Sequence, residues 1–306
     1  MVTKISAFSL EWIEEKKKEI KYSTYCAYQT ILGNYVDVFF DDVKDISQEN
    51  VVAFRESLEA KKLSSKSIKD ILVVLRMLVK FLIRKRILTS DSLMWEISLK
   101  NSRDEIEILS KTSFKKLHTF LLANFSFSNL GILIVMNTGL RIGEICALKW
   151  EDIDLVDSKI LVSKTLQRVY DRKEKTSKII IDTPKTISSK REIPISSEIV
   201  RLVKPLKRVV NNSFFVISNS NRPFEPRTYR EIFKKILLEN DLPVVKFHSL
   251  RHTFATRCVE ANSNYKTISS ILGHSNVVTT MNLYVHPNNE EKKQCIERML
   301  KKTLGI

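Results

Sequence analysis

Apolar residues recur every three or four positions along the first hundred residues, and this spacing predicts helices that each bury one face. Four segments carry the pattern: "SAFSLEWIEEKKKEI", "STYCAYQTILGNYVDVFF", "SQENVVAFRESLEA" and "SSKSIKDILVVLRMLVKFLIRKRIL". The first begins with a plausible N-cap, and the third opens like a capping box. Together they predict a small helical bundle. The last segment also has a basic side, made of Lys66, Lys69, Arg76, Lys80, Arg84 and Lys85.

The pattern changes in the second part of the chain, where helical and strand-like segments are mixed. "TSFKKLHTFLLANF" and "SNLGILIVMNTGLRIGEICAL" predict helices, with a turn at Thr138-Gly139. The β-branched segments "KILVSKTLQRVY", "KIIIDTPKT" and "SSKREIPIS" then predict three short strands. Because no helix separates these strands, we expect one small antiparallel sheet, followed by helices from "SSEIVRLV" onward. The predicted fold is mainly α, with an α+β second domain.

The stretch "SLKNSRDEIEILSKTSFKKL" has no strong period and mixes charges of both signs, which predicts a joint between two domains. We place a helical domain at residues 1–102, a linker at 103–112 and a second domain at 113–306. A chain of 306 residues with 43% hydrophobic content is long enough for two cores.

Positive charge exceeds negative charge along the chain. The sequence has 51 Lys and Arg against 35 Asp and Glu, a formal charge of +16. A polyanion is therefore the first partner to expect, and double-stranded DNA is favoured over a membrane because the cations are not gathered in one amphipathic segment. No apolar run reaches the ~18 residues of a membrane span, and the first residues lack the apolar region of a signal peptide. We expect a cytoplasmic protein.

Several short segments combine cations with polar groups that suit phosphate chemistry. Arginine forks match two phosphate oxygens at once, and His248 and Arg251 are spaced to share one helix face. The candidate catalytic residues are Arg141, Lys185, His248, Arg251, His274 and Tyr284. The cations and histidines among them would stabilise the extra negative charge of a phosphate diester in its transition state.

Tyr284 is the candidate nucleophile. A free phenol has a pKa of about 10, and neighbouring cations lower the cost of forming the phenolate. Its attack would give a covalent phosphotyrosine that keeps the energy of the broken DNA bond, so rejoining would need no ATP. The sequence has no evident acidic metal cluster and no CxxC pair among its four cysteines. We therefore expect no metal and no cofactor.

These segments resemble the tyrosine recombinase (phage integrase) family over nearly the whole chain. "TGLRIGEICALKW" is similar to the first arginine box, "HSLRHTFAT" to the His-x-x-Arg box, and "LGHSNVVTTMNLYVH" to the last histidine and tyrosine segment. "TPKTISSKREIPI" resembles the hairpin lysine segment of integrases from mobile elements of the conjugative-transposon kind. The resemblance implies a SAM-like core-binding domain followed by a DNA breaking-rejoining catalytic domain, the two clamping duplex DNA.

The resemblance also implies a role for each candidate. Arg141, supported by Glu144, and Arg251 would clamp the scissile phosphate. Lys185 would protonate the leaving 5′-oxygen, and His248 would assist proton transfer. His274 would donate a hydrogen bond, and Tyr284 would attack to give a 3′-phosphotyrosyl intermediate.

A further implication concerns assembly. The family pattern implies a homo-tetramer on paired sites, formed from free monomers or dimers, with accessory directionality or DNA-bending proteins. The tail "NNEEKKQCIERMLKKTLGI" would dock on a neighbouring protomer or pack on its own domain. Its apolar stripe consists of Ile296, Met299, Leu300 and Leu304.

Other interpretations stay open from the sequence. Lys190 competes with Lys185 across the same turn, His252 fits a packing role, and Arg141 alone fits a salt bridge to Glu144. Integration or excision of a mobile element, Xer-like replicon resolution and DNA inversion all suit the two-domain layout. A type IB-like topoisomerase and a non-catalytic DNA-binding protein of this fold are the remaining alternatives.

Overall fold

The computed structural model describes residues 4–93, 95, 107–183, 190–274, 276–278, 281 and 289–304. The chain divides into two compact units. The first comprises Met1–Asp104 with Arg168–Ile179, and the second comprises Glu105–Gln167 with Ile180–Ile306. Helices dominate both, and short antiparallel strands occur between residues 153 and 194. The predicted mainly α fold with an α+β second part is therefore confirmed. No helix in the described part of the chain is both long and apolar enough to cross a membrane.

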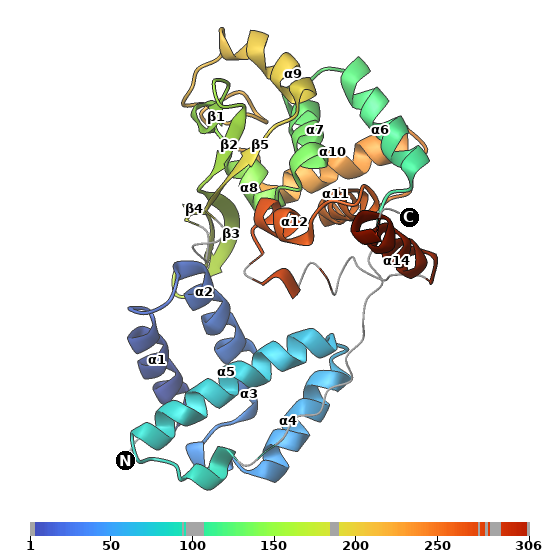
Figure 1. Cartoon of the computed structure of the whole chain (residues 1–306). Helices are drawn as coiled ribbons and strands as arrows, with labels where there is room; N and C mark the ends of the chain where they lie inside the picture. Colours follow the sequence, from blue (N-terminus) through green and yellow to red (C-terminus); the bar gives the residue numbers. More distant parts are fainter. Residues whose placement is uncertain are drawn as a thin grey trace. The chain divides into compact units, whose positions relative to one another are not determined.

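The first unit is a bundle of helices (Figure 1). They are α1 (Ile5–Lys16), α2 (Tyr22–Ile31), α3 (Asp37–Phe39), α4 (Gln48–Ala60) and α5 (Ser65–Arg84). The four predicted helices are present, with one difference. The segment predicted as one helix over 23–40 is interrupted by a π-helical turn at Leu32–Val36. The serine at the start of α4, Ser47, accepts a hydrogen bond from the Asn50 N–H at 3.2 Å, as an N-cap does.

The longest helix, α5, forms the core of this unit. Its buried residues fall at the three- and four-residue spacing read from the sequence, and Ser64 caps its first turn. Lys66, Lys69 and Lys80 lie on its exposed side. Arg76 differs from them, because it is half-buried and donates to the carbonyl oxygen of Trp95 at 2.7 Å. The basic side of α5 is thus a solvent-exposed face from which Arg76 is withdrawn.

The tip of a β-hairpin, Arg168–Ile179, belongs to this first unit. Asp171 is 4% exposed and accepts a hydrogen bond from the Tyr22 hydroxyl. Arg172 donates to the carbonyl oxygen of Gly33 at 2.9 Å. Both contacts join the hairpin tip to residues of α2 and the turn that follows it.

The second unit is built around α7 (Phe127–Thr138), whose residues are almost all buried. α7 contacts α6, α9, α10 and α11, so it is surrounded on several sides (Figure 1). The helices of this unit are α6 (Lys111–Ala123), α7, α8 (Ile142–Ala147), α9 (Ser197–Lys207), α10 (Pro226–Glu239), α11 (His248–Glu260), α12 (Tyr265–Leu272) and α14 (Asn289–Leu304). A helix that is apolar all round must be covered all round, which explains its central place.

The strands form two sheets, where the sequence predicted one. The first sheet has the order β1 (Ile153–Asp154), β2 (Lys159–Val162) and β5 (Arg191–Pro194), all antiparallel. β3 (Thr165–Asp171) pairs with β4 (Thr176–Asp182) as a separate two-stranded ribbon. The prediction of a single sheet was wrong because β2 finds its partner beyond the ribbon, where Ile160 faces Ile193. Strand propensity does not encode which strands pair.

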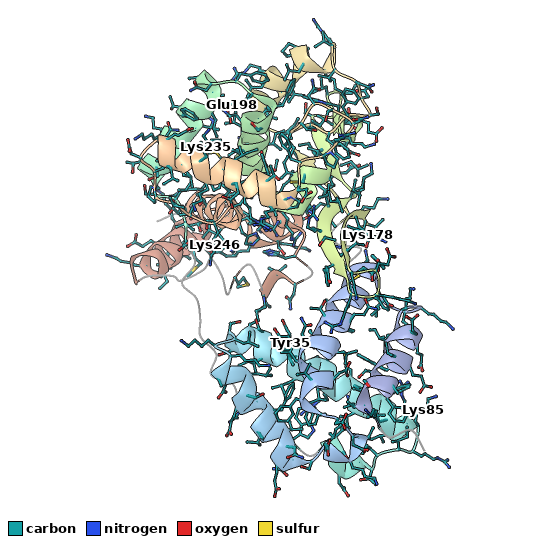
Figure 2. The ribbon with its side chains drawn as sticks, turned by 180° about the vertical axis from the view of Figure 1, so that it is seen from behind. Tyr35, Lys85, Lys178, Glu198, Lys235 and Lys246 are labelled. Atoms are coloured by element: carbon teal, nitrogen blue, oxygen red, sulfur yellow. The ribbon has the colours of Figure 1, made fainter. Side chains whose placement is uncertain are left out.

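Lysines lie on the surface of both units. Lys85 follows α5 in the first unit, and Lys235 and Lys246 belong to the second (Figure 2). Each of these residues is exposed. The surplus positive charge is therefore spread over the described surface of both units.

Candidate active site

The turn between α7 and α8 places Arg141. Gly139 ends α7 in the left-handed region at φ 65°, where a residue without Cβ is favoured. Arg141 then precedes the first residue of α8, and its backbone N–H donates to the Glu144 carboxylate at 2.8 Å. Its Nη1 donates to the other oxygen of the same carboxylate at 2.9 Å. The sequence left open a salt bridge to Glu144, and that bridge is present.

Glu144 is a buried carboxylate held by two arginines. It is 4% exposed, and besides Arg141 it contacts Arg191 at the start of β5. Burial raises the pKa of this carboxyl, but the hydrogen bonds and charge of Arg191, followed by the charge of Arg141, leave it below its ordinary value. Glu144 is therefore ionised at neutral pH and compensates part of the buried positive charge.

Arg251 is 2% exposed, so it is among the most buried cations of the described residues. Its Nη1 donates to the carbonyl oxygen of Gly139 at 2.9 Å, and its Nη2 donates to that of Leu272 at 2.7 Å. A guanidinium this deeply buried needs hydrogen-bond acceptors. The acceptors found are backbone carbonyl oxygens, which bring no net charge, so the positive charge of Arg251 is not cancelled by these two bonds.

The end of α12 organises the site. The Gly273 N–H bonds to the Ser270 carbonyl and the His274 N–H to the Ser269 carbonyl, both at 3.0 Å, and Gly273 has φ 66°. This is a Schellman ending, which satisfies two of the last carbonyls of the helix and fixes the residue after the glycine. His274 is thereby held next to the carbonyl end of α12.

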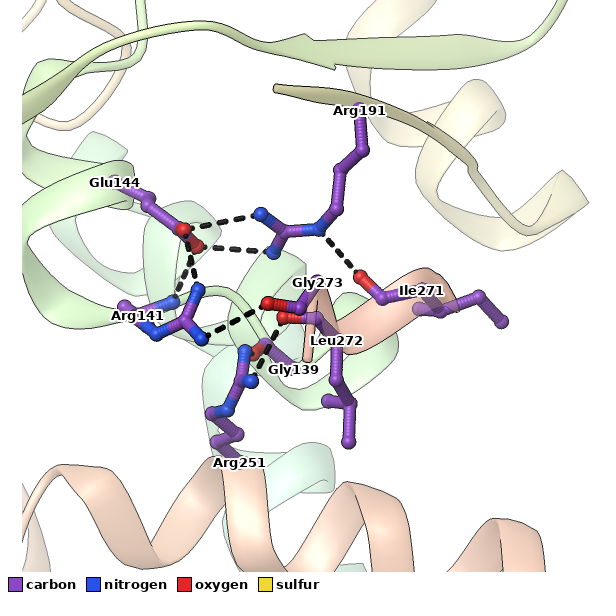
Figure 3. A network of polar contacts seen from close by, with 8 residues as sticks. All are labelled: Gly139, Arg141, Glu144, Arg191, Arg251, Ile271, Leu272 and Gly273. Carbon is purple, nitrogen blue, oxygen red and sulfur yellow. Dashed lines mark hydrogen bonds and ion pairs between the residues drawn. The ribbon is translucent and has the colours of Figure 1, made fainter. Parts of the chain in front are cut away.

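The next three carbonyls accept hydrogen bonds from three different arginines. The carbonyl oxygen of Ile271 accepts a hydrogen bond from Arg191 Nε at 2.6 Å. That of Leu272 accepts one from Arg251 Nη2 at 2.7 Å, and that of Gly273 accepts one from Arg141 Nη2 at 3.3 Å. Figure 3 shows the three guanidinium groups converging on this turn from separate segments. We name Arg141, Arg191 and Arg251 the arginine cluster. The carbonyl end of a helix carries partial negative charge, which favours cations there.

Two histidines lie beside the arginine cluster. His248 starts α11, and its ring meets that of His252 edge to face with centroids 4.6 Å apart. Desolvation of the ring is the largest cause that lowers the pKa of His248, to about 4, and the charges of His252, Arg251 and Arg141 follow. Burial, then Arg251, Arg141 and Arg191, lower the pKa of His274 to about 4 as well. Both rings are therefore neutral at pH 7 and can accept a proton.

The structure thus brings together four of the six candidate residues: Arg141, His248, Arg251 and His274. Lys185 and Tyr284 lie outside the described residues. The competing Lys190 is described and exposed. His252 contacts His248 by its ring, which agrees with the packing role left open by the sequence.

One member of the cluster, Arg191, was missed by sequence reasoning. The signal that could have found it is the alternation of β5, where Arg191, Ile193 and Ile195 are buried and Glu192 and Pro194 are exposed. A cation on the core face of a strand needs a buried acceptor. No group of three or more histidine, cysteine, aspartate or glutamate side chains suited to a metal occurs among the described residues.

Comparison with known proteins gives consistent matches over both parts of the chain. Residues 102–291 match the model of the phage integrase family, and residues 14–86 match that of the phage integrase N-terminal SAM-like domain. A XerC-like tyrosine recombinase of Caldanaerobacter subterraneus is 30% identical over 213 residues, covering 64% of this chain and 54% of the relative. The chain therefore spans about half the length of this relative.

Two further matches cover more of the chain. The ICEBs1 integrase of Bacillus subtilis is 23% identical over 292 residues, covering 91% of this chain and 78% of the relative. The Tn1549 transposon integrase, solved in complex with transposon right end DNA, has a TM-score of 0.81 at 21% identity. That match covers 97% of this chain and 99% of the solved chain. At this level of identity the structural likeness establishes the fold.

Proposed function

This chain belongs to the phage integrase family, and from that membership we propose that it is a tyrosine-type site-specific DNA recombinase that integrates and excises a mobile element. It would cleave and rejoin duplex DNA through a covalent 3′-phosphotyrosyl intermediate. The observation that carries the proposal is the convergence of Arg141 and Arg251 on one turn (Figure 3). The charges of both arginines also act on His248 and His274. The likeness to the ICEBs1 integrase, over 91% of this chain and 78% of that relative, supports the biological task.

The charges of the site suit a phosphate diester. Arg141 and Glu144 compensate each other, while Arg251 and Arg191 add two further positive charges, one of which Glu144 also contacts. These three arginines and Glu144 together carry a formal net positive charge before DNA arrives. Guanidinium groups fixed in advance stabilise charge that develops on the non-bridging oxygens, without reorganising during the reaction. Arg141 keeps 36% of its side chain exposed, so it is open to a phosphate from solvent.

In the proposed reaction, the Tyr284 oxygen attacks the scissile phosphorus and the bond from phosphorus to the 5′-oxygen breaks. Arg141 and Arg251 hold the non-bridging oxygens, and His274 donates a hydrogen bond to one of them. His248, neutral at pH 7, accepts the phenolic proton, and Lys185 supplies a proton to the leaving 5′-oxygen. Attack of a 5′-hydroxyl on the phosphotyrosine reverses these steps and rejoins the strand.

The proposed division of labour follows the chain. Residues 1–102 form the core-binding domain, 103–112 a linker and 113–306 the catalytic domain. The exposed lysines of α5 contact the DNA backbone, which predicts salt-dependent binding. We place the protein in the cytoplasm, where its DNA substrate is.

Assembly into a homo-tetramer on paired sites is part of the proposal. The last helix, α14, exposes an apolar stripe whose members are 39% to 61% exposed: Ile296, Met299, Leu300 and Leu304. Such a stripe gains by docking on a neighbouring protomer. Removal of residues after Pro287 should spare binding to a single site and abolish two-site complexes. Accessory bending or directionality proteins would act on this assembly.

A suicide substrate tests the chemistry. A duplex from the ends of the element, nicked near the cleavage point, loses its leaving strand and traps the protein on DNA. The wild-type chain should form a covalent adduct resistant to denaturant, and Tyr284→Phe should form none. Tyr265→Phe, a change of the same kind at an exposed tyrosine of α12, is the matched control and should trap normally. Absence of adduct with the wild-type chain would leave DNA binding without catalysis.

A two-site assay separates recombination from topoisomerase action. Plasmids that carry two element ends should yield exchanged products. Relaxation of supercoils without exchange of partners would contradict the proposed task and favour a topoisomerase.

A further inference from the structure

We propose that Arg191 is a positioning residue for DNA cleavage: it occupies the Glu144 carboxylate and the carbonyl end of α12, and so keeps Arg141 and His274 available to the scissile phosphate. This inference rests on the proposed function, because it assigns Arg191 a part in the same site. None of the sequence motifs singles out this arginine.

Arg191 starts an edge strand of the three-stranded sheet. It is the first residue of β5, and it faces Val162 of β2 across the sheet. Its side chain is 6% exposed. A guanidinium that is buried without acceptors is strongly destabilising, so its contacts must be well formed. Through these contacts, the Arg191 side chain connects the edge of the sheet with α8 and with the end of α12.

Arg191 forms a two-pronged contact with Glu144. Arg191 Nη1 lies 3.0 Å from Glu144 Oε1, and Arg191 Nη2 lies 3.0 Å from Oε2. This two-pronged arrangement is the strongest that an arginine forms with a carboxylate. Arg141 contacts the same carboxylate through its Nη1 and its backbone N–H. Arg191 therefore takes the fork position on Glu144 and leaves the Arg141 guanidinium turned partly outward.

The charge balance gives this arrangement a purpose. Arg141, Arg191 and Glu144 together carry one net positive charge. If Arg191 were neutral, Arg141 and Glu144 would form an uncharged pair, and the buried carboxylate would compete with the phosphate for Arg141. Arg191 thus supplies the charge that Glu144 would otherwise take from the phosphate site.

Arg191 also contacts the turn that precedes His274. Arg191 Nε donates to the Ile271 carbonyl at 2.6 Å, three residues before His274. A Cβ at Gly273 would lie 3.0 Å from Arg191 Cδ and 3.1 Å from its Nη1, so the guanidinium lies directly against the turn. Holding this carbonyl and this glycine fixes the Schellman ending that presents His274. Arg191 therefore acts on both sides of the site.

The chain offers a matched control in Arg257 on α11. Arg257 Nη1 contacts both Glu260 oxygens, at 2.7 and 2.8 Å, and its Nη2 donates to the Leu109 carbonyl at 2.6 Å. It combines a carboxylate and a backbone carbonyl as Arg191 does. It contacts no residue of the arginine cluster in these bonds. Its removal should cost stability and spare catalysis.

The experiment compares Arg191→Met, Arg191→Lys and Arg257→Met in the full chain. Single-turnover cleavage of the nicked duplex is measured at saturating DNA, beside DNA affinity and urea unfolding. We expect Arg191→Met to lower the cleavage rate about 10- to 100-fold, by analogy with the loss seen when a residue that orients a metal ligand is removed. Arg191→Lys, which restores charge without the fork, should recover part of the loss. Arg257→Met should cleave at the wild-type rate wherever it is folded.

A second readout separates positioning from stability. Among the described residues, the charged or titratable groups that lower the pKa of His274 are Arg251 and His248 of α11, Arg141 before α8, and Arg191 of β5. Removing the Arg191 charge should move the pKa of His274 upward, seen by NMR of histidine-labelled protein without DNA. His252, whose pKa is lowered by burial and by Arg251, is the internal reference and should not move.

Cleavage by Arg191→Met at half the wild-type rate or more, with the pKa of His274 unchanged, would overturn the inference. If Arg191→Met does not fold, Arg191→Lys decides: cleavage equal to the wild type removes the need for the fork. The proposed function fails separately, when the wild-type chain forms no adduct. The pKa of His274 still tests the contact in that case.

Discussion

The two units of this protein differ in the exposure of their cations. In the second unit, Arg251 is 2% exposed and donates to fixed backbone carbonyls. In the first unit, Arg84 at the end of α5 is exposed and lies 3.8 Å from Glu15, and Lys85 lies 2.7 Å from Glu11. Buried cations depend on geometry, while exposed pairs are weakened by water and salt. Exposed cations such as those of the first unit suit non-specific contact with a polyanion, and guanidinium groups fixed as in the second suit recognition of one anionic group.

The largest effect should come from removing the shared carboxylate of the buried cluster. Glu144→Gln removes the carboxylate that the buried Arg191 and the half-buried Arg141 share. Breaking a buried pair in this way costs about 3–5 kcal/mol. Urea unfolding followed by tryptophan fluorescence measures it. Glu260→Gln, at a carboxylate side chain that is 39% exposed, should cost about 1 kcal/mol or less. Equal losses at the two sites would remove the distinction between buried and exposed charge.

Acid should weaken the second unit through its histidines. The pKa values of His248 and His274 are lowered to about 4, while an unfolded histidine titrates at about 6.5. Between these values the unfolded chain binds protons that the folded chain does not. The free energy of unfolding should therefore fall as pH drops from about 6.5 toward 4, and these two groups add no slope above about 6.5.

Urea unfolding at several pH values measures this slope. Replacing both His248 and His274 by asparagine should flatten it over the same range. An unchanged slope in the double variant would show that the crowded cations around these rings do not control their titration.

A smaller effect is expected for the exposed lysines of α5. Each lysine that no longer meets a phosphate should lower the slope of log affinity against log salt by about 1. Lys66→Ala with Lys69→Ala should therefore lower the slope by about 2 and leave cleavage at saturating DNA unchanged. Val73→Ala, at an apolar residue of α5 that is 48% exposed, is the neutral control. A cleavage defect in the lysine variant would contradict the separation of bulk charge from chemistry.

The smallest effect should belong to the surface pair of Glu11 and Lys85. Despite a distance of 2.7 Å, both side chains are nearly half exposed. Their coupling in a double-mutant cycle should be the weakest of those compared and should vanish at about 1 M salt. The same cycle for Glu144 and Arg191 should give a larger coupling that persists at high salt. A salt-resistant surface pair would be the result that conflicts with this view.

Much of the fold was predictable because apolar spacing decides it. The helix over Ser65–Arg84 follows from its period and its serine cap. The single predicted sheet was wrong, since the pairing of Ile160 with Ile193 spans the intervening ribbon and leaves no local signal. The π-helical turn at Leu32–Val36 was missed for a similar reason: apolar residues continue through it at helical spacing.

The candidate site was predictable only in part. Arg141, His248, Arg251 and His274 came from motifs, and the described structure brings them together. Their acceptors could not be read from the sequence, because the oxygens at Gly139 and Leu272 are backbone atoms that every residue carries. Arg191 was missed because a lone arginine in a strand looks like any surface cation until its burial is known.

The arginine cluster binds main-chain oxygens, which affects how many substitutions the surrounding residues tolerate. The groups that seat the guanidiniums at the end of α12 do not depend on which side chains stand at Ile271 and Leu272. Apolar exchanges that fill the same volume at these two places should therefore leave the arginine cluster intact. A library at these two places can therefore exchange apolar residues of similar volume, provided that the glycine after them is kept.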